Sequence, residues 1–244
     1  MRLKKRISYG GYMLEEMKAR VYRANTMLKK YGIVILNEGS VSEIDQTTGY
    51  VVIRPSGVSY EKMTPNNMVV VDLEGKRIEG DFAPAADTPT HLELYKRFCG
   101  IGGISRTYSK WATVFAQCGM AIPVLGTAHS SSFFGPVPCT RKLSDGEVFG
   151  KYETEIGRVV AELFTNETVV SMPAVLVHSH GPITWGGNAI EAVERSVLLE
   201  QCAMMAWHTL MLNPFVSFQD SLLKKHALYN QNDSIPSKKE EKKC

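Results

Sequence analysis

The sequence lacks several features that would assign it to a class of protein at once. Its five cysteines are odd in number and form no C-x-x-C pair, which argues against a disulfide framework or a cysteine zinc site and favours reduced thiols in the cytoplasm. No run approaches about 18 apolar residues, and no apolar run of signal-peptide length follows the basic N-terminus, so neither a membrane span nor a secretion signal is expected.

Charge of one sign is also nearly absent. The net charge is +3, and the 28 basic residues are interspersed with 25 acidic ones. A protein that binds nucleic acid or an anionic membrane usually gathers its basic residues into a patch or stripe. We therefore expect neither partner.

What is present fits one large α/β domain, because 44% of the 244 residues are apolar and can form a substantial core. Residues 1–12 are basic and end near a glycine pair, which predicts a flexible extension. Residues 13–229 are expected to form the single domain. Residues 230–244 are rich in charge, and we expect a disordered tail there.

Hydrophobic periodicity predicts the order of the elements. An early β meander follows the first helix, and helices alternate with strands only in the middle of the chain. This order predicts three layers, α/β/α, with helices on both faces of a mixed, largely antiparallel sheet. The expected helices are 14–30, 88–98, 109–118, 144–164 and 190–212, and the expected strands are 33–36, 41–45, 50–53, 68–73, 101–107 and 174–177. His178 and His180 are expected to alternate on a strand, with only His180 facing the site.

Five short segments stand out for their specific sequences: RPSGV (54–58), DTPTH (87–91), PCTRK (138–142), VHSHGP (177–182) and WG (185–186). In this order they resemble L-ribulose-5-phosphate 4-epimerase of the class II aldolase group. The resemblance covers about Met13 to His226 and implies sugar-phosphate chemistry at a zinc ion, with the site between subunits of a four-fold homotetramer.

The zinc ligands that the resemblance implies are largely replaced. Asp87 and His180 stand at two ligand positions, but the two strand histidines are replaced by Arg106 and Tyr108. Arginine has no lone pair to donate, and tyrosine is a poor substitute for imidazole on zinc. We therefore expect no metal cofactor, and we expect Arg106 to form an ion pair with Asp87 in place of the metal.

The phosphate and proton-transfer positions are altered as well. Alanines replace two serine hydroxyls of the cradle, whereas Arg54 keeps a charge that can pair with phosphate, so only weak sugar-phosphate binding is expected. Ser131 replaces an acid/base aspartate, and His226 matches a family histidine; both are vestigial catalytic positions. The vestigial cradle comprises Gly39, Ser40, Arg54, Ser56, Gly57, Ala85, Ala86 and Asp87.

Three functions remain open at this point. In the first, the chain is a pseudoenzyme, either natural or deliberately stripped of its site, that lacks zinc and epimerase activity. Alternatively, it is an active epimerase or aldolase on a related sugar phosphate that uses Arg106 and Arg54 in place of the metal. The third possibility is a binding or scaffold protein that uses only the fold.

Overall fold

The computed structural model describes residues 2–233, with side chains described for residues 14–226. Helix α1 (Arg2–Lys30) begins within the expected N-terminal extension, and helix α9 (Asp220–Asp233) ends inside the expected tail. The prediction for residues 234–244 lies outside the described residues. The domain limits at 13 and 229, and the flexibility expected beyond them, stay predictions.

A single seven-stranded sheet, in the order β4-β3-β2-β1-β5-β7-β6, forms the middle layer. All pairs of named strands are antiparallel, and the parallel component is an isolated bridge between Cys139 and Leu176. The expected fold class is confirmed. The strands are β1 (Ser40–Asp45), β2 (Tyr50–Ile53), β3 (Val69–Val71), β4 (Arg77–Glu79), β5 (Gly103–Arg106), β6 (Ala174–Val177) and β7 (Gly181–Gly186).

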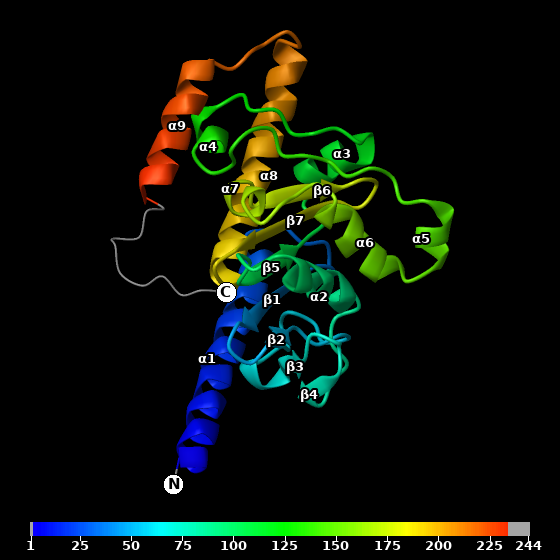
Figure 1. The fold of residues 1–244 in the computed structure, drawn as a ribbon. Coiled ribbons are helices and arrows are strands. Elements are labelled where there is room, and N and C mark those ends of the chain that lie inside the picture. Colours follow the sequence, from blue (N-terminus) through cyan, green and yellow to red (C-terminus); the bar gives the residue numbers. More distant parts are fainter. Residues whose placement is uncertain (1, 234–244) are drawn as a thin grey trace.

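Helices cover both faces of this sheet (Figure 1). Val51 and Ile53 pack in one core cluster with residues of α2 (Thr88–Arg97) and α6 (Tyr152–Ala161). Val52 points to the opposite face and packs in a second cluster with residues of α1 and α8 (Ala189–Leu212). This alternation is the two-residue period of a strand that is buried on both sides.

The remaining helices are short or peripheral. Helix α3 joins the core beside α8, α4 contacts α9, and α5 packs on α6. No helix in the described part of the chain is both long and apolar enough to cross a membrane. Their bounds are α3 (Lys110–Cys118), α4 (Thr127–Ser130), α5 (Asp145–Phe149), α7 (Thr168–Ser171) and the 3-10 turn η1 (Pro65–Asn67).

The helix predicted over 144–164 was wrong, because the chain breaks it into α5 and α6. Ser144 caps α5 as expected, with its side chain accepting a hydrogen bond from the Glu147 amide. At Gly150 the backbone leaves the helical region, with φ −91° and ψ −132°. A Cβ there would lie 2.7 Å from the Gly146 carbonyl oxygen, so the break needs glycine. Residue 153 is consequently placed in the first turn of a separate helix.

Three further details differ from expectation. Residues 33–36 form no strand, because Leu36 adopts a left-handed conformation with φ 52° and the segment turns. His178 and His180 lie in the turn between β6 and β7 rather than on a strand, with Ser179 between them at φ 61°. Strands β4 and β7 were missed; β7 opens with Gly181-Pro182, a pair that argues against a central strand.

Candidate functional site

A cavity of about 340 Å³ lies beside the end of β5. It gathers most of the residues that the sequence placed in the vestigial cradle and metal positions. Those on its wall are Gly39, Arg54, Ser56, Gly57, Ala85, Ala86, Asp87, Arg106 and Tyr108, and they are joined by Asn37, Glu38, Pro55, Val58 and Glu153.

The other predicted positions lie around or away from the cavity. Ser40 is buried beneath it, and His180 lies behind Arg106. Ser131 is the C-cap residue that follows helix α4, and His226 on α9 is hydrogen-bonded through Nδ1 to the Ser130 hydroxyl at 2.6 Å. Neither Ser131 nor His226 is among the residues that line the cavity.

Strand β5 brings Arg106 to the cavity wall, and Tyr108 follows two residues after the last residue of the strand. The strand lies between β1 and β7, where Arg106 pairs with Ser40 on one side and Ile183 on the other. A Cβ on Gly103 would collide with the Asn188 backbone at the start of α8, so the glycine lets the strand approach this helix closely. The spacing of two residues then sends both side chains to one face, as predicted.

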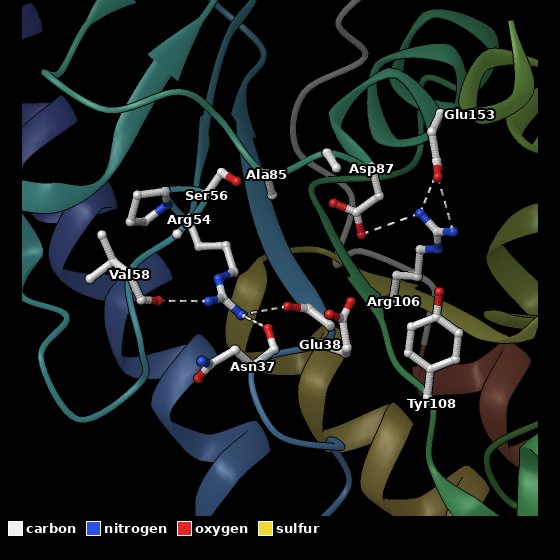
Figure 2. Close-up of a pocket in the computed structure, with 14 residues that line it drawn as sticks. Asn37, Glu38, Arg54, Ser56, Val58, Ala85, Asp87, Arg106, Tyr108 and Glu153 are labelled. Atoms are coloured by element: carbon white, nitrogen blue, oxygen red, sulfur yellow. Dashed lines mark hydrogen bonds and ion pairs between the residues drawn. The ribbon is translucent and has the colours of Figure 1, made fainter.

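Arg106 is the centre of the charged network in this cavity (Figure 2). Its side chain is only 3% exposed. Nη1 lies 2.7 Å from Oε2 of Glu153 and 3.4 Å from Oδ2 of Asp87. The predicted ion pair with Asp87 is therefore confirmed, but the tighter carboxylate partner is Glu153, which sequence reasoning missed.

His180 accepts hydrogen bonds from the same guanidinium. Nε of Arg106 lies 3.0 Å from Nε2 of His180, and Nη2 contacts the same nitrogen. Because Nε2 accepts, the ring is neutral with its proton on Nδ1, which lies 3.4 Å from the Tyr152 hydroxyl. Burial lowers the pKa of His180, and the neighbouring Arg106 charge lowers it further, to about 3. Tyr108 contacts the imidazole by its ring, with the ring centroids 4.9 Å apart.

Asp87 is held from its other side by a line of buried hydrogen bonds. The Ser40 hydroxyl donates to Oδ2 of Asp87 at 2.6 Å and lies 3.0 Å from Nε2 of His91. Nδ1 of His91 continues the line to the Ser42 hydroxyl at 2.7 Å. Although burial opposes it, interaction with His91, Arg106 and Ser40 holds the pKa of Asp87 well below its ordinary value. Asp87 is therefore a fixed anion.

These residues do not fit a zinc ion. Nε2 of His180 is occupied by Arg106, and Oδ2 of Asp87 is shared between Ser40 and Arg106. A guanidinium between the two remaining ligands would also repel a cation. Within residues 2–233, no group of three or more histidine, cysteine, aspartate or glutamate side chains is arranged to hold a metal.

Arg54 also forms its hydrogen bonds within the protein. Nη1 donates to the carbonyl oxygens of Asn37 and Gly39, each at 2.8 Å, and Nη2 donates to that of Val58 at 2.9 Å. The guanidinium also stacks on the Tyr60 ring, 4.3 Å from its centroid. These contacts tie two loops together, and pairing of Arg54 with a phosphate stays a prediction that would have to compete with them.

The missed residue Glu153 has a weak signal in the sequence. Its carboxylate reaches Arg106 and also accepts a hydrogen bond from the Thr90 hydroxyl at 2.8 Å. Only the break at Gly150, followed by the acidic first turn of α6, could have indicated that Glu153 is not on the solvent face of one long helix. Tyr152 was missed for the same reason.

Comparison with known proteins identifies the fold and the family. The chain belongs to the class II aldolase and adducin N-terminal domain family, whose model matches residues 19–207. A structure of L-fuculose 1-phosphate aldolase is 20% identical, with a TM-score of 0.73, and covers 88% of this chain and 96% of its own. The same enzyme from Glaciozyma antarctica PI12 is 15% identical, with a TM-score of 0.73 and coverages of 88% and 81%.

A third similar structure carries a broader description. YgbL from Escherichia coli, described as a putative aldolase/epimerase/decarboxylase, is 19% identical, with a TM-score of 0.69, and covers 87% of this chain and 98% of its own. At these identities the likeness establishes the fold, whereas function depends on the side chains in the site.

Proposed function

We propose that this class II aldolase family member does not catalyse metal-dependent aldol or epimerase chemistry and acts as a binding or scaffold protein. The observation that carries this proposal is the position of Arg106. Its guanidinium binds Asp87, Glu153 and His180 together, so the side chains left from the metal site hold an internal cation. Such a site provides no Lewis acid for an enediolate.

The finer identity rests on the sequence segments quoted above. Their resemblance to L-ribulose-5-phosphate 4-epimerase supports descent of this chain from a sugar-phosphate epimerase. The loss of hydroxyls at Ala85 and Ala86 and the commitment of Arg54 to backbone carbonyls both weaken a phosphate site. We therefore propose that the chain descends from a sugar-phosphate epimerase and has lost the epimerase activity.

An active enzyme that uses Arg106 and Arg54 instead of zinc is the less favoured candidate. A guanidinium stabilises a developing oxyanion when its donors point at the reacting oxygen. Arg106 donates to Glu153 and His180, and Arg54 donates to three carbonyl oxygens. Recruiting either one would require these buried bonds to break first.

Assay of epimerase activity tests the proposal directly. Purified protein, with zinc added, is incubated with L-ribulose 5-phosphate in deuterated water, and both the 4-epimer and proton exchange are followed by NMR. We expect neither above the protein-free background. Turnover that requires the protein and disappears in the Asp87→Asn variant would contradict the proposal.

A homotetramer in the cytoplasm completes the proposal. Several large apolar side chains are strongly exposed in the single chain, with Phe149, Leu212 and Phe215 at 88%, 89% and 93%. Burial between subunits would remove this surface from water. The four described cysteines are free, which agrees with a reducing compartment. Sedimentation that gives the mass of one chain would contradict the tetramer.

A further inference from the structure

The open part of the candidate cavity has a different chemistry from its charged floor. Figure 2 shows Glu38 lying between Arg54 and Tyr108, with Ser56 and Ala85 across the opening. Arg106 donates to Glu153 and His180, and Arg54 donates to three backbone carbonyl oxygens. A phosphate would therefore compete with these contacts for either guanidinium.

Glu38 differs from the other charged groups of this cavity because it has no partner. Asp87 and Glu153 are paired with Arg106, whereas no described residue forms a hydrogen bond or ion pair with the Glu38 carboxylate. The Glu38 carboxylate also acts on a neighbouring side chain of the cavity wall. Burial raises the pKa of Tyr108, and the negative charge of Glu38 adds to that rise. The wall carries three carboxylates and two guanidiniums, so it has a net negative charge.

Building on the proposed function of a binding protein, we infer that this cavity binds a small polyhydroxylated molecule that carries an ammonium group, with the ammonium against Glu38. The Ser56 and Tyr108 hydroxyls lie on the same cavity and provide hydrogen bonds to ligand hydroxyls. A volume of about 340 Å³ lies within the range of small-molecule sites and accommodates a six-carbon polyol.

The same wall disfavours the sugar phosphates of the family. A phosphate dianion would lie close to the unpaired Glu38 carboxylate and would meet the Ala85 and Ala86 methyl groups in place of hydroxyl donors. Glu38 is exposed at the opening, so water screens this repulsion in part, and the missing hydroxyl donors add to it. The preference for an ammonium over a phosphate is therefore the distinguishing property of this site.

Three probes that differ in one substituent test this preference. They are 1-amino-1-deoxyglucitol, glucitol and glucitol 6-phosphate, and each is titrated into the full chain at pH 7 by calorimetry. We expect the amine to bind about tenfold more tightly than glucitol, a difference of about 1.4 kcal/mol, and the phosphate to bind more weakly than glucitol. In the Glu38→Gln variant, the amine and glucitol should bind equally.

Glu194→Gln is the matched control, because Glu194 is exposed on α8 and is not among the residues that line the cavity. It should keep the tenfold preference. Tightest binding of the phosphate, no binding of any probe, or an amine preference that survives Glu38→Gln would each overturn the inference. These results leave the proposed lack of activity standing, and turnover of ribulose 5-phosphate would overturn that proposal without deciding the amine preference.

Discussion

Nη1 of Arg106 lies 3.4 Å from Oδ2 of Asp87, within an ion-pair distance, at the positions where the resemblance implies two zinc ligands. The Arg106 guanidinium does not form a bidentate pair with Asp87 and is directed mainly at Glu153, at 2.7 Å. The guanidinium thus pairs with two carboxylates whose burial would otherwise be more costly. This internal cation is the basis of the predictions that follow.

Arg106→Met should strongly destabilise the fold. The substitution leaves Asp87 and Glu153 without their cation and leaves Nε2 of His180 without its donor. Breaking one side of a buried charge pair costs about 3 kcal/mol or more. Urea unfolding, followed by far-UV circular dichroism, measures the change in the free energy of unfolding.

Arg158→Met is the matched control for this measurement. Arg158 also pairs with two glutamates, but its side chain is 52% exposed, so its removal should cost less than about 1 kcal/mol. Adding Glu153→Gln to Arg106→Met should recover part of the lost stability, because a partly buried carboxylate is removed with its partner. Equal costs for Arg106→Met and Arg158→Met would refute the role assigned to Arg106.

Arg54→Lys should destabilise the protein by about 2 kcal/mol although it keeps the charge. An ammonium cannot reproduce the planar fork that reaches Asn37, Gly39 and Val58 while stacking on Tyr60. Thermal and urea unfolding measure the loss. Arg77→Lys serves as the control: Arg77 also donates to a backbone carbonyl, that of Phe82, but it is exposed and should change stability by less than about 0.5 kcal/mol.

The predictable part of the site depends on local geometry. Arg106 and Tyr108 share a cavity wall because alternation along a strand is a local rule, and the segment at residues 87–91 placed Asp87 opposite them. Glu153 lies 47 residues beyond Arg106, and its approach depends on the break at Gly150. That break was hidden because apolar residues continue at helical spacing on both sides of it.

The hydrogen bonds of Arg54 to backbone carbonyls could not be predicted from the sequence, for a different reason. Two of its three carbonyl partners, Asn37 and Gly39, face it because the loop before β1 turns through positive φ at Leu36, 52°, and at Gly39, 103°. The left-handed backbone is intrinsically unfavourable for leucine, so the sequence gives no reason to expect it at Leu36. The two-sided core was predictable because β-branched runs bounded by turns identify buried strands whatever the loops do.

Stability should fall in weak acid because of His180. Its pKa is about 3 in the folded protein and about 6.5 when unfolded, so the unfolded state binds the extra proton first. The groups facing the ring are Arg106, Asp87, Tyr108 and Tyr152. The free energy of unfolding should therefore decrease by about 1 kcal/mol per pH unit below pH 6.5, whereas the contribution of Asp87, whose pKa is lowered, is lost only at still lower pH.

His180→Gln isolates this effect, because the glutamine oxygen can accept from Arg106 but does not titrate. Its loss of stability between pH 7 and pH 5 should be smaller than that of the unmodified protein by about 1 to 2 kcal/mol. His208→Gln, a change at an exposed histidine, should leave the pH dependence as it is. An identical pH profile for His180→Gln and the unmodified protein would exclude the buried neutral histidine.

Zinc binding tests most directly the claim that Arg106 takes the place of the metal. The protein is dialysed against zinc at pH 7, and bound metal is measured by elemental analysis in parallel with the Asp87→Asn and His180→Gln variants. The account predicts that the unmodified protein retains no more zinc than either variant, since Asp87 and His180 are engaged by the guanidinium. One zinc ion per chain that is lost in both variants would contradict it.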